Sequence, residues 1–214
     1  DVTETARDES GAYKISSGME LSWLAQQVNA GKNTGCSAVL TKDIDLGGEE
    51  WTPIGKASSS YAFKGSFDGR GFSVKNLKIQ ASSSSNYGLF GYVYGGTVKN
   101  LTVSGEITVG GSGRSTYGVG GIAGKFDGTT GTIENCVNEV TISASQNAGG
   151  IAGLVSGGYG TADKQIRSCA NLADVETNSH NAAGIVGYIY IPFSIHVKVN
   201  GCYVFSGTLS GPVQ

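Results

Sequence analysis

Short segments in which apolar and polar positions alternate occupy most of the chain, and Gly, Ser or Asn residues separate them. In one such segment, Leu89 and Val93 hold one set of alternating positions, and Tyr92 and Tyr94 hold the other. A period of two residues is typical of a β-strand with one face in the core. The pattern therefore predicts an all-β protein built from many short strands.

Two short motifs recur in a fixed order along the chain. The first is a tetrapeptide with Gly at both ends, at residues 88–91, 121–124, 150–153 and 184–187. The second has apolar first and fourth positions, at residues 98–101, 133–136, 166–169 and 199–202, with an earlier copy at 74–77. The last three copies of the second motif are 33 residues apart. A fixed period of this length indicates a solenoid of stacked coils.

The fold class that fits this repeat is a right-handed parallel β-helix. Coils that stack at a strand spacing of about 4.8 Å bring equivalent residues together into ladders and make the core continuous. A β-sandwich is the structural alternative, because it also has short strands and frequent turns. It gives no reason for positions to recur every 33 residues, so the solenoid is preferred.

A comparison of the copies indicates which side chains face the core. Positions equivalent to Leu89 and Val93 are apolar in every copy, and the position midway between them is Gly. The side chains expected to face outward next to them are Tyr92, Lys125, Leu154 and Tyr188. The second motif breaks the alternation, which predicts a bend at residues 99–100 and their equivalents. Its fourth position predicts a buried structural ladder of Leu77, Leu101, Cys136, Cys169 and Cys202.

The N-terminal region has a different pattern. We expect residues 1–12 to be a flexible tail and residues 13–35 to form a capping strand and a short helix. Ser17 and Glu20 have the spacing of a capping box, and apolar residues follow at helical intervals. A helix over the open end of the solenoid would protect its strand edges. Residues 36–214 are expected to form a β-helix of about six coils that continues in the full-length protein.

These motifs resemble bacterial surface proteins with GLUG repeats, which are named after the Gly-Leu-any-Gly tetrapeptide. The segments that carry the resemblance are 13–16, 28–31, 40–46, 51–55, 63–69 and 87–91. A similar module occurs beside certain secreted immunoglobulin-A-cleaving metallopeptidases. The resemblance implies a right-handed β-helix on a secreted or cell-surface protein, and it implies no catalytic residues.

Composition and charge narrow the range of partners. The 214 residues include 35 Gly and 3 Pro without a Gly-X-Y period, which excludes collagen and indicates many tight turns. The formal net charge is −2 and Lys and Arg form no dense cluster, so neither nucleic acid nor an anionic membrane surface is an expected partner. No apolar run approaches the roughly 18 residues that span a bilayer, so we expect no membrane insertion. Because the chain begins with Asp1, we expect a processed fragment.

The four cysteines are expected to be free thiols. Same-column residues on adjacent coils point in parallel rather than at each other, which disfavours disulfides. Cys36 has no evident partner, and a disulfide between it and a repeat cysteine stays open as an alternative. The spacing of Cys and His does not resemble a zinc site.

The sequence contains no convincing catalytic constellation and implies no cofactor. Neither His180 nor His196 has a nucleophile motif beside it. Asp43 and Asp45 share one strand face and are a weak calcium candidate, because calcium prefers carboxylate oxygens. Their alternative is an ordinary exposed polar face. Some parallel β-helices are polysaccharide lyases or hydrolases, so a carbohydrate-active, pectin-lyase-like enzyme is an alternative function.

Outward-facing tyrosines are the best ligand-binding candidates. Tyr92 and Tyr94 lie on one coil, and Tyr188 and Tyr190 hold equivalent places three repeats later. Aromatic side chains can stack on sugars or anchor a protein partner. We therefore expect a non-catalytic extracellular module, either an adhesin-like surface for a glycan or host protein or a rigid spacer. An accessory region of a secreted peptidase is a further alternative, and the oligomeric state stays open.

Overall fold

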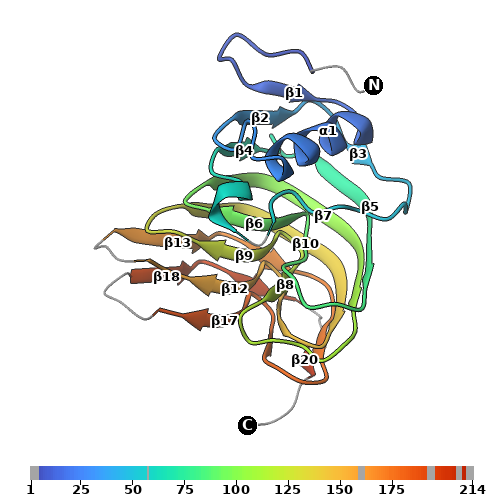
Figure 1. Ribbon diagram of the computed structural model, residues 1–214, viewed down its shortest axis with the longest axis vertical. Helices are drawn as coiled ribbons and strands as arrows, with labels where there is room; N and C mark the ends of the chain where they lie inside the picture. Colours follow the sequence, from blue (N-terminus) through green and yellow to red (C-terminus); the bar gives the residue numbers. More distant parts are fainter. Residues whose placement is uncertain (1–4, 57, 159–161, 192–195, 206–208, 211–214) are drawn as a thin grey trace.

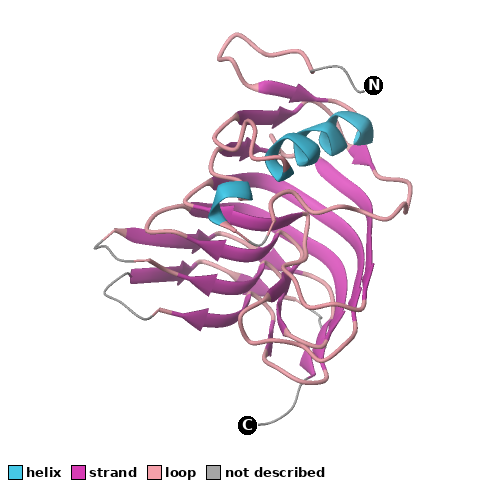
Figure 2. Ribbon diagram, viewed as in Figure 1, coloured by secondary structure: helices cyan, strands magenta, loops and turns pink. Residues whose placement is uncertain are grey.

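The computed structural model describes residues 5–56, 58–158, 162–191, 196–205 and 209–210. The chain is a parallel β-solenoid of about five turns with one α-helix at its N-terminal end (Figures 1 and 2). Helix α1 spans Gly18–Asn29, and a 3-10 helix, η1, spans Ser59–Tyr61. The strands are β1 (Tyr13–Ile15), β2 (Ser37–Leu40), β3 (Ile44–Asp45), β4 (Ser66–Asp68), β5 (Ser73–Ala81), β6 (Phe90–Tyr94), β7 (Thr97–Val109), β8 (Gly118–Gly120), β9 (Ala123–Asp127), β10 (Thr132–Ala144), β11 (Asn147–Gly149), β12 (Ala152–Ser156), β13 (Asp163–Arg167), β14 (Ala170–Asn171), β15 (Val175–Thr177), β16 (Ala182–Ala183), β17 (Val186–Tyr190), β18 (His196–Asn200), β19 (Tyr203–Val204) and β20 (Leu209–Ser210). This architecture confirms the predicted all-β solenoid with a short N-terminal helix.

The strands form three sheets, because successive coils stack strand upon strand. Sheet A has 13 strands, and its main path runs β1-β2-β4-β7-β10-β13-β18. Sheet B has the order β17-β12-β9-β6, and sheet C has the order β16-β11-β8. Neighbouring strands along these paths are parallel. The sequence predicts about six coils in residues 36–214. Six strands from this range lie on the main path of sheet A, namely β2, β4, β7, β10, β13 and β18, whereas sheet B contains four strands.

Strand registers place equivalent positions of successive coils side by side. In sheet A, Val98 lies opposite Ile133, which in turn lies opposite Ile166. The predicted inward residues of sheet B in the first three coils have an exposure of 0%: Leu89, Val93, Ile122, Phe126, Ile151 and Val155. In the last coil Ile185 is half-buried and Ile189 is 43% exposed, because β17 is the edge strand of sheet B.

The glycine between the inward apolar positions allows two layers of backbone to touch. A Cβ atom on Gly153 would lie 2.1 Å from the backbone nitrogen of Val119, and one on Gly124 would lie 2.5 Å from that of Tyr87. Real Cβ atoms do not approach other atoms so closely. The repeated Gly therefore lets the chain before each tetrapeptide, including sheet C, lie directly against sheet B.

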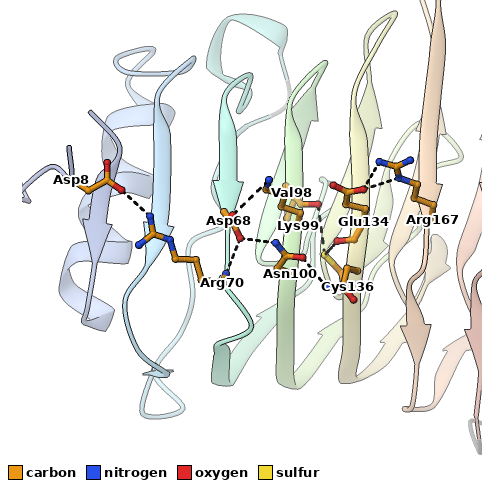
Figure 3. A network of polar contacts seen from close by, with 10 residues as sticks. Asp8, Asp68, Arg70, Val98, Lys99, Asn100, Glu134, Cys136 and Arg167 are labelled. Atoms are coloured by element: carbon orange, nitrogen blue, oxygen red, sulfur yellow. Dashed lines mark hydrogen bonds and ion pairs between the residues drawn. The ribbon is translucent and has the colours of Figure 1, made fainter. Parts of the chain in front are cut away.

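The predicted bend is a residue in the left-handed backbone region that recurs from coil to coil. Its φ angle lies between 50° and 59° at Asn76, Asn100, Asn135, Ser168 and Gly201. Asn and Gly adopt this conformation at low cost. Side chains at this corner also join neighbouring coils. The Nδ2 of Asn100 donates to the Oδ1 of Asp68 at 2.9 Å (Figure 3). The Nδ2 of Asn135 donates to the Oδ1 of Asn100 at 2.8 Å.

The predicted buried ladder requires one correction. Leu101 lies opposite Cys136, and the registers beside Cys169 and Cys202 continue the same column. Leu77 does not belong to this column, because it lies opposite Gly105. Strand β4 occupies the place next to residues 97–99 of β7. The 74–77 copy therefore pairs further along β7, beyond an irregularity in the register between residues 74 and 77.

All four cysteines carry free thiols. Cys136 and Cys169 are buried, while Cys36 and Cys202 are half-buried. The Sγ atom of each ladder cysteine points to a backbone carbonyl of the preceding coil, at 3.7 to 3.8 Å. Burial raises the pKa of Cys136 far above its ordinary value and that of Cys36 to about 11, so these two thiols are protonated at neutral pH.

Helix α1 covers the N-terminal end of the solenoid (Figure 1). The Oγ of Ser17 accepts from the backbone nitrogen of Glu20 at 3.2 Å, as the capping box predicts. The Glu20 carboxylate reaches back to the backbone nitrogen of Ser16, one residue before the cap. Of the expected flexible tail, residues 1–4 lie outside the described part, and residues 5–12 turn back so that Arg7 forms an antiparallel bridge with Tyr13. In the described part of the chain, no helix has the length and apolar character to cross a bilayer.

Candidate functional site

The outer face of sheet B carries the most distinctive surface feature of the described chain. Its register arranges the outward side chains in two adjacent columns. The first column contains Tyr92, Lys125, Leu154 and Tyr188, and the second contains Tyr94, Asp127, Ser156 and Tyr190. Strand pairing thus brings residues from four repeats onto one small surface.

A groove of about 510 Å³ lies over the later coils of this face. We call it the sheet B groove. Its lining residues are Ser115, Thr116, Lys125, Asp127, Leu154, Ser156, Gly157, Tyr188 and Tyr190. A volume of this size is within the range of small-molecule sites, and the lining combines aromatic, hydroxyl and charged groups.

One wall of the sheet B groove is the loop between β7 and β8, which contributes Ser115 and Thr116. Buried Asn147 on β11 positions this loop: its Nδ2 donates to the carbonyl oxygen of Ser115 at 2.9 Å and to that of Tyr117 at 3.2 Å. The Nδ2 of Asn181 in turn donates to the Oδ1 of Asn147 at 3.1 Å. Because both the Nδ2 and the Oδ1 of Asn147 are hydrogen-bonded, this side chain holds the loop that forms the wall in a defined position.

Another part of the lining consists of two tyrosines on the edge strand β17. The rings of Tyr188 and Tyr190 are stacked, with centroids 6.5 Å apart and an interplanar angle of 26°. Tyr188 is 37% exposed and Tyr190 is 55% exposed. The two rings therefore form an accessible aromatic platform.

Lys125 and Asp127 supply the charges of the groove. The Nζ of Lys125 lies 3.2 Å from the Oδ2 of Asp127. Asp127 also accepts from the phenol of Tyr92 at 2.7 Å and from the backbone nitrogen of Gly128 at 2.7 Å. Burial alone would raise the pKa of Asp127, but these two hydrogen bonds and the Lys125 ammonium lower it below its ordinary value. The carboxylate is therefore ionised at neutral pH and paired with a cation.

Beneath the groove lies a buried lysine that the sequence interpretation missed. Lys164 has an exposure of 0%, and its ammonium donates to the carbonyl oxygen of Ser156 and, at 3.5 Å, to that of Phe126. Its Nζ also lies 5.1 Å from the centroid of the Phe126 ring. Burial lowers the pKa of Lys164 to about 8, against the opposing effect of Asp127. The alternation along β13 that buries Ile166 also points Lys164 inward. This alternation in the sequence could have predicted the burial of Lys164.

The four candidate tyrosines have different environments. Tyr188 and Tyr190 line the sheet B groove, whereas Tyr92 and Tyr94 are not among its lining residues. Tyr92 is only 4% exposed, and burial together with Asp127 raises the pKa of its phenol. Tyr94 is 36% exposed and packs edge-to-face on Tyr92, with centroids 6.2 Å apart. The expectation that Tyr92 presents an accessible outer ring is therefore wrong, because the charged side chains of the next coil cover it: the Lys125 Nζ lies 4.9 Å from its ring centroid.

The weak calcium candidates are engaged in hydrogen bonds to neighbouring groups. Asp43 accepts from the Nζ of Lys75 at 2.6 Å and from the backbone nitrogen of Ser73 at 3.0 Å. Asp45 accepts from the Nδ2 of Asn76 and from the backbone nitrogen of Gly47, each at 2.7 Å. These contacts lower the pKa of both carboxyl groups. Within the described ranges, no group of three or more His, Cys, Asp or Glu side chains is arranged to hold a metal ion.

A second groove, of about 410 Å³, crosses the outer face of sheet A. Its lining includes Lys78, Glu106, Thr108, Thr141 and Ser143, but no aromatic residue. Glu106 and Lys78 are paired in register on neighbouring strands. This surface is an ordinary polar sheet face with a shallow depression at the irregular register of β5 and β7.

Comparisons with known proteins give one sequence relative and one related structure. No family profile matches the chain. An alignment of 152 positions, which covers 66% of the chain, is 31% identical to halomucin of Haloquadratum walsbyi (strain DSM 16790 / HBSQ001). The match takes in 2% of the length of halomucin, so the chain spans a very small part of that protein.

The related structure is the crystal structure of a "putative immunoglobulin A1 protease" from Bacteroides ovatus, with a TM-score of 0.61. The alignment covers 96% of this chain and 69% of that chain, at 19% sequence identity. The GLUG family itself remains a resemblance. At this level of identity, the comparison establishes that the two chains share a fold.

Proposed function

We propose that the chain is a non-catalytic module of a secreted or cell-surface protein, and that it binds a ligand on the outer face of sheet B. The observation that carries the proposal is the sheet B groove, where an exposed aromatic platform faces hydroxyl and charged side chains. The solenoid beneath it has a continuous apolar core, which makes a stiff support for such a surface.

The carboxylates of the groove argue for binding rather than hydrolysis. A glycosidase uses two carboxyl groups about 5–10 Å apart, one of them protonated. Asp127 is the single carboxylate among the lining residues, and its lowered pKa keeps it ionised. Neither histidine is among the lining residues of the groove: the Nδ1 of His180 contacts the Oγ of Ser179 and the carbonyl of Ser145, and His196 lies beside Asp163.

A role as a spacer or as an accessory region of a secreted peptidase is a second candidate. The shared fold with the Bacteroides ovatus structure favours this idea. The two roles are compatible, because a stiff solenoid can hold a neighbouring domain and also present a binding face.

A binding experiment tests the proposal. The purified chain is applied to immobilised glycans and to host extracellular-matrix proteins, and it is also incubated with a polysaccharide panel with and without calcium. We expect binding to one ligand class, loss of that binding in a Tyr188→Ala/Tyr190→Ala variant, and no product release. Absence of binding to both classes would leave the spacer role, and release of sugar products would show an enzyme.

A further inference from the structure

We propose that the sheet B groove is a binding site for an uncharged saccharide, with a sugar ring stacked on the platform of Tyr188 and Tyr190. This inference rests on the proposed function and specifies the ligand class. The platform, the charge balance of the groove and an unpaired hydroxyl each support it.

The platform suits the apolar face of a pyranose ring. The C–H bonds on one face of such a ring pack on aromatic rings, and the hydroxyl groups extend sideways from it. Tyr188 and Tyr190 present two nearly parallel rings at the rim. The hydroxyl side chains of Ser115 and Thr116 line the same groove, where they can donate to or accept from sugar hydroxyls.

The charges of the groove favour an uncharged ligand. Among the lining residues, the charged pair Lys125 and Asp127 lies 3.2 Å apart and is balanced, so the lining itself offers no unbalanced charge to an anionic or cationic sugar. Tyr92, Gly128 and Lys125 use three of the four acceptor sites of the Asp127 carboxylate, which leaves one acceptor site on Asp127 and two of the three donors of Lys125 for a ligand. This pair can therefore contact neighbouring hydroxyl groups of a sugar without an excess of either charge.

An unpaired hydroxyl on the floor supplies the independent observation. Ser156 is 8% exposed and lines the groove, and its Oγ atom has no hydrogen-bond partner within the described residues. A buried hydroxyl without a partner costs free energy. Ser156 stands in the outward column between Asp127 and Tyr190, and its Oγ is enclosed, with less than 1 Å² accessible. A small shift of the neighbouring rim side chains on ligand binding would bring a ligand hydroxyl or a bridging water to it.

The rival occupant is a peptide, which would use the groove differently. A peptide commonly adds to a sheet edge through backbone hydrogen bonds, and β17 is such an edge. The features described above are side-chain features on the face of the sheet. They match a ligand rich in hydroxyl groups better than an extended backbone.

The test uses the described chain and an array of neutral, sialylated, uronic-acid and sulfated glycans, followed by calorimetric titration with the soluble form of the strongest neutral glycan. We expect binding to neutral glycans. The Tyr188→Ala and Tyr190→Ala variants should each lose about tenfold or more in affinity. Tyr94→Ala is the matched control, since Tyr94 has the same column position as Tyr190 but lies outside the groove; its affinity should stay within about twofold.

The Ser156→Ala variant separates a ligand contact from a packing role. If the Oγ contacts the ligand, this variant keeps or gains thermal stability but binds the glycan several-fold more weakly. Equal glycan affinity in Ser156→Ala, Tyr190→Ala and the unaltered chain would overturn the proposal. So would binding restricted to anionic glycans. Binding to a matrix protein that Tyr190→Ala abolishes, without glycan binding, would overturn the saccharide while the proposed binding function survives.

Discussion

The early and late coils of sheet B place tyrosines in the same two outward columns, yet only in the late coil are both rings of the pair accessible. Tyr92 is buried, and its phenol is bonded to Asp127 of the next coil. Tyr190 is 55% exposed beside a groove. The difference shows that the repeat decides the direction of a side chain, whereas its neighbours decide its exposure.

The neighbours differ for an identifiable reason. After the coil that carries Tyr92, the next coil contributes Lys125 and Asp127, whose long or charged side chains reach back over the ring. After β12, Tyr188 and Tyr190 lie on the edge strand β17. The same residue type therefore has a packing role in one coil and an exposed position in the other.

The largest expected effect compares truncation of the two tyrosines. Tyr92→Ala should lower the free energy of unfolding by about 3–4 kcal/mol, because it removes a buried ring and leaves Asp127 without one donor. Tyr190→Ala should change it by less than about 0.5 kcal/mol. Urea denaturation of both variants measures this. Equal losses would contradict the assigned difference in burial.

The buried lysine under the late coils should give a pH-dependent effect. The pKa of Lys164 is lowered to about 8 from an ordinary value of 10.5. Between pH 8 and pH 10.5, the Lys164 side chain is therefore protonated in the unfolded chain and largely neutral in the folded chain. Stability contributed by this site therefore rises as pH increases from about 8 to about 10.5, by about 3 kcal/mol.

The unfolding free energy of the unaltered chain should be compared with that of the Lys164→Met variant at each pH. This comparison isolates Lys164, because the raised pKa values of Cys36 and Tyr92 lower the stability of both proteins at high pH. The difference in unfolding free energy between the two proteins should change with pH in favour of the unaltered chain. A pH-independent difference from pH 7 to pH 10 would show that the ammonium is not buried.

Asp127, which connects the two regions, should have an intermediate effect. Its folded-state pKa lies below the ordinary 3.8, so its stabilisation is present above that value and disappears as pH falls through the folded-state pKa. Asp127→Asn should cost about 1 kcal/mol at pH 7. The cost should shrink below about pH 3. Thermal denaturation at several pH values tests this, and a cost that grows on acidification would be the opposite result.

Tyr94→Ala should have a small effect, larger than that of Tyr190→Ala and no larger than that of Asp127→Asn. Its ring is 36% exposed and contacts mainly Tyr92 and, at 5.9 Å, the Nζ of Lys64. We expect a loss of about 0.5–1 kcal/mol in unfolding free energy. Differential scanning calorimetry would detect the corresponding small shift. A loss as large as that of Tyr92→Ala would mean that Tyr94 also belongs to the packed part of the face.

Features that depend on local periodicity could be predicted from the sequence. The inward columns around Leu89 and Val93 follow from alternation, and the bend at Asn100 follows from the break in that alternation. The helix after Ser17 follows from capping-box spacing. The buried pair of Asn138 and Asn171, whose amides are bonded at 2.7 Å, follows from the position of each residue two places after a ladder cysteine.

Features that depend on distant neighbours could not be predicted in the same way. The 74–77 motif resembles 98–101, but the register is decided by β4, which already occupies the adjacent place. The wall of the groove depends on Asn147, which bonds to residues 30 and 32 positions earlier. The burial of Tyr92 depends on Asp127, 35 positions later. Each of these contacts joins coils, and the repeat pattern alone does not specify which side chains meet.

The central claim is that the late coils, and not the early ones, form the binding face. Chemical-shift mapping of the isotope-labelled chain, titrated with the strongest neutral oligosaccharide from the array, tests it most directly. We expect the largest chemical-shift changes on residues 125–127, 154–156 and 188–190, with little change at Tyr94. Largest changes on sheet A around Glu106 and Thr141, or around Tyr94 alone, would contradict it.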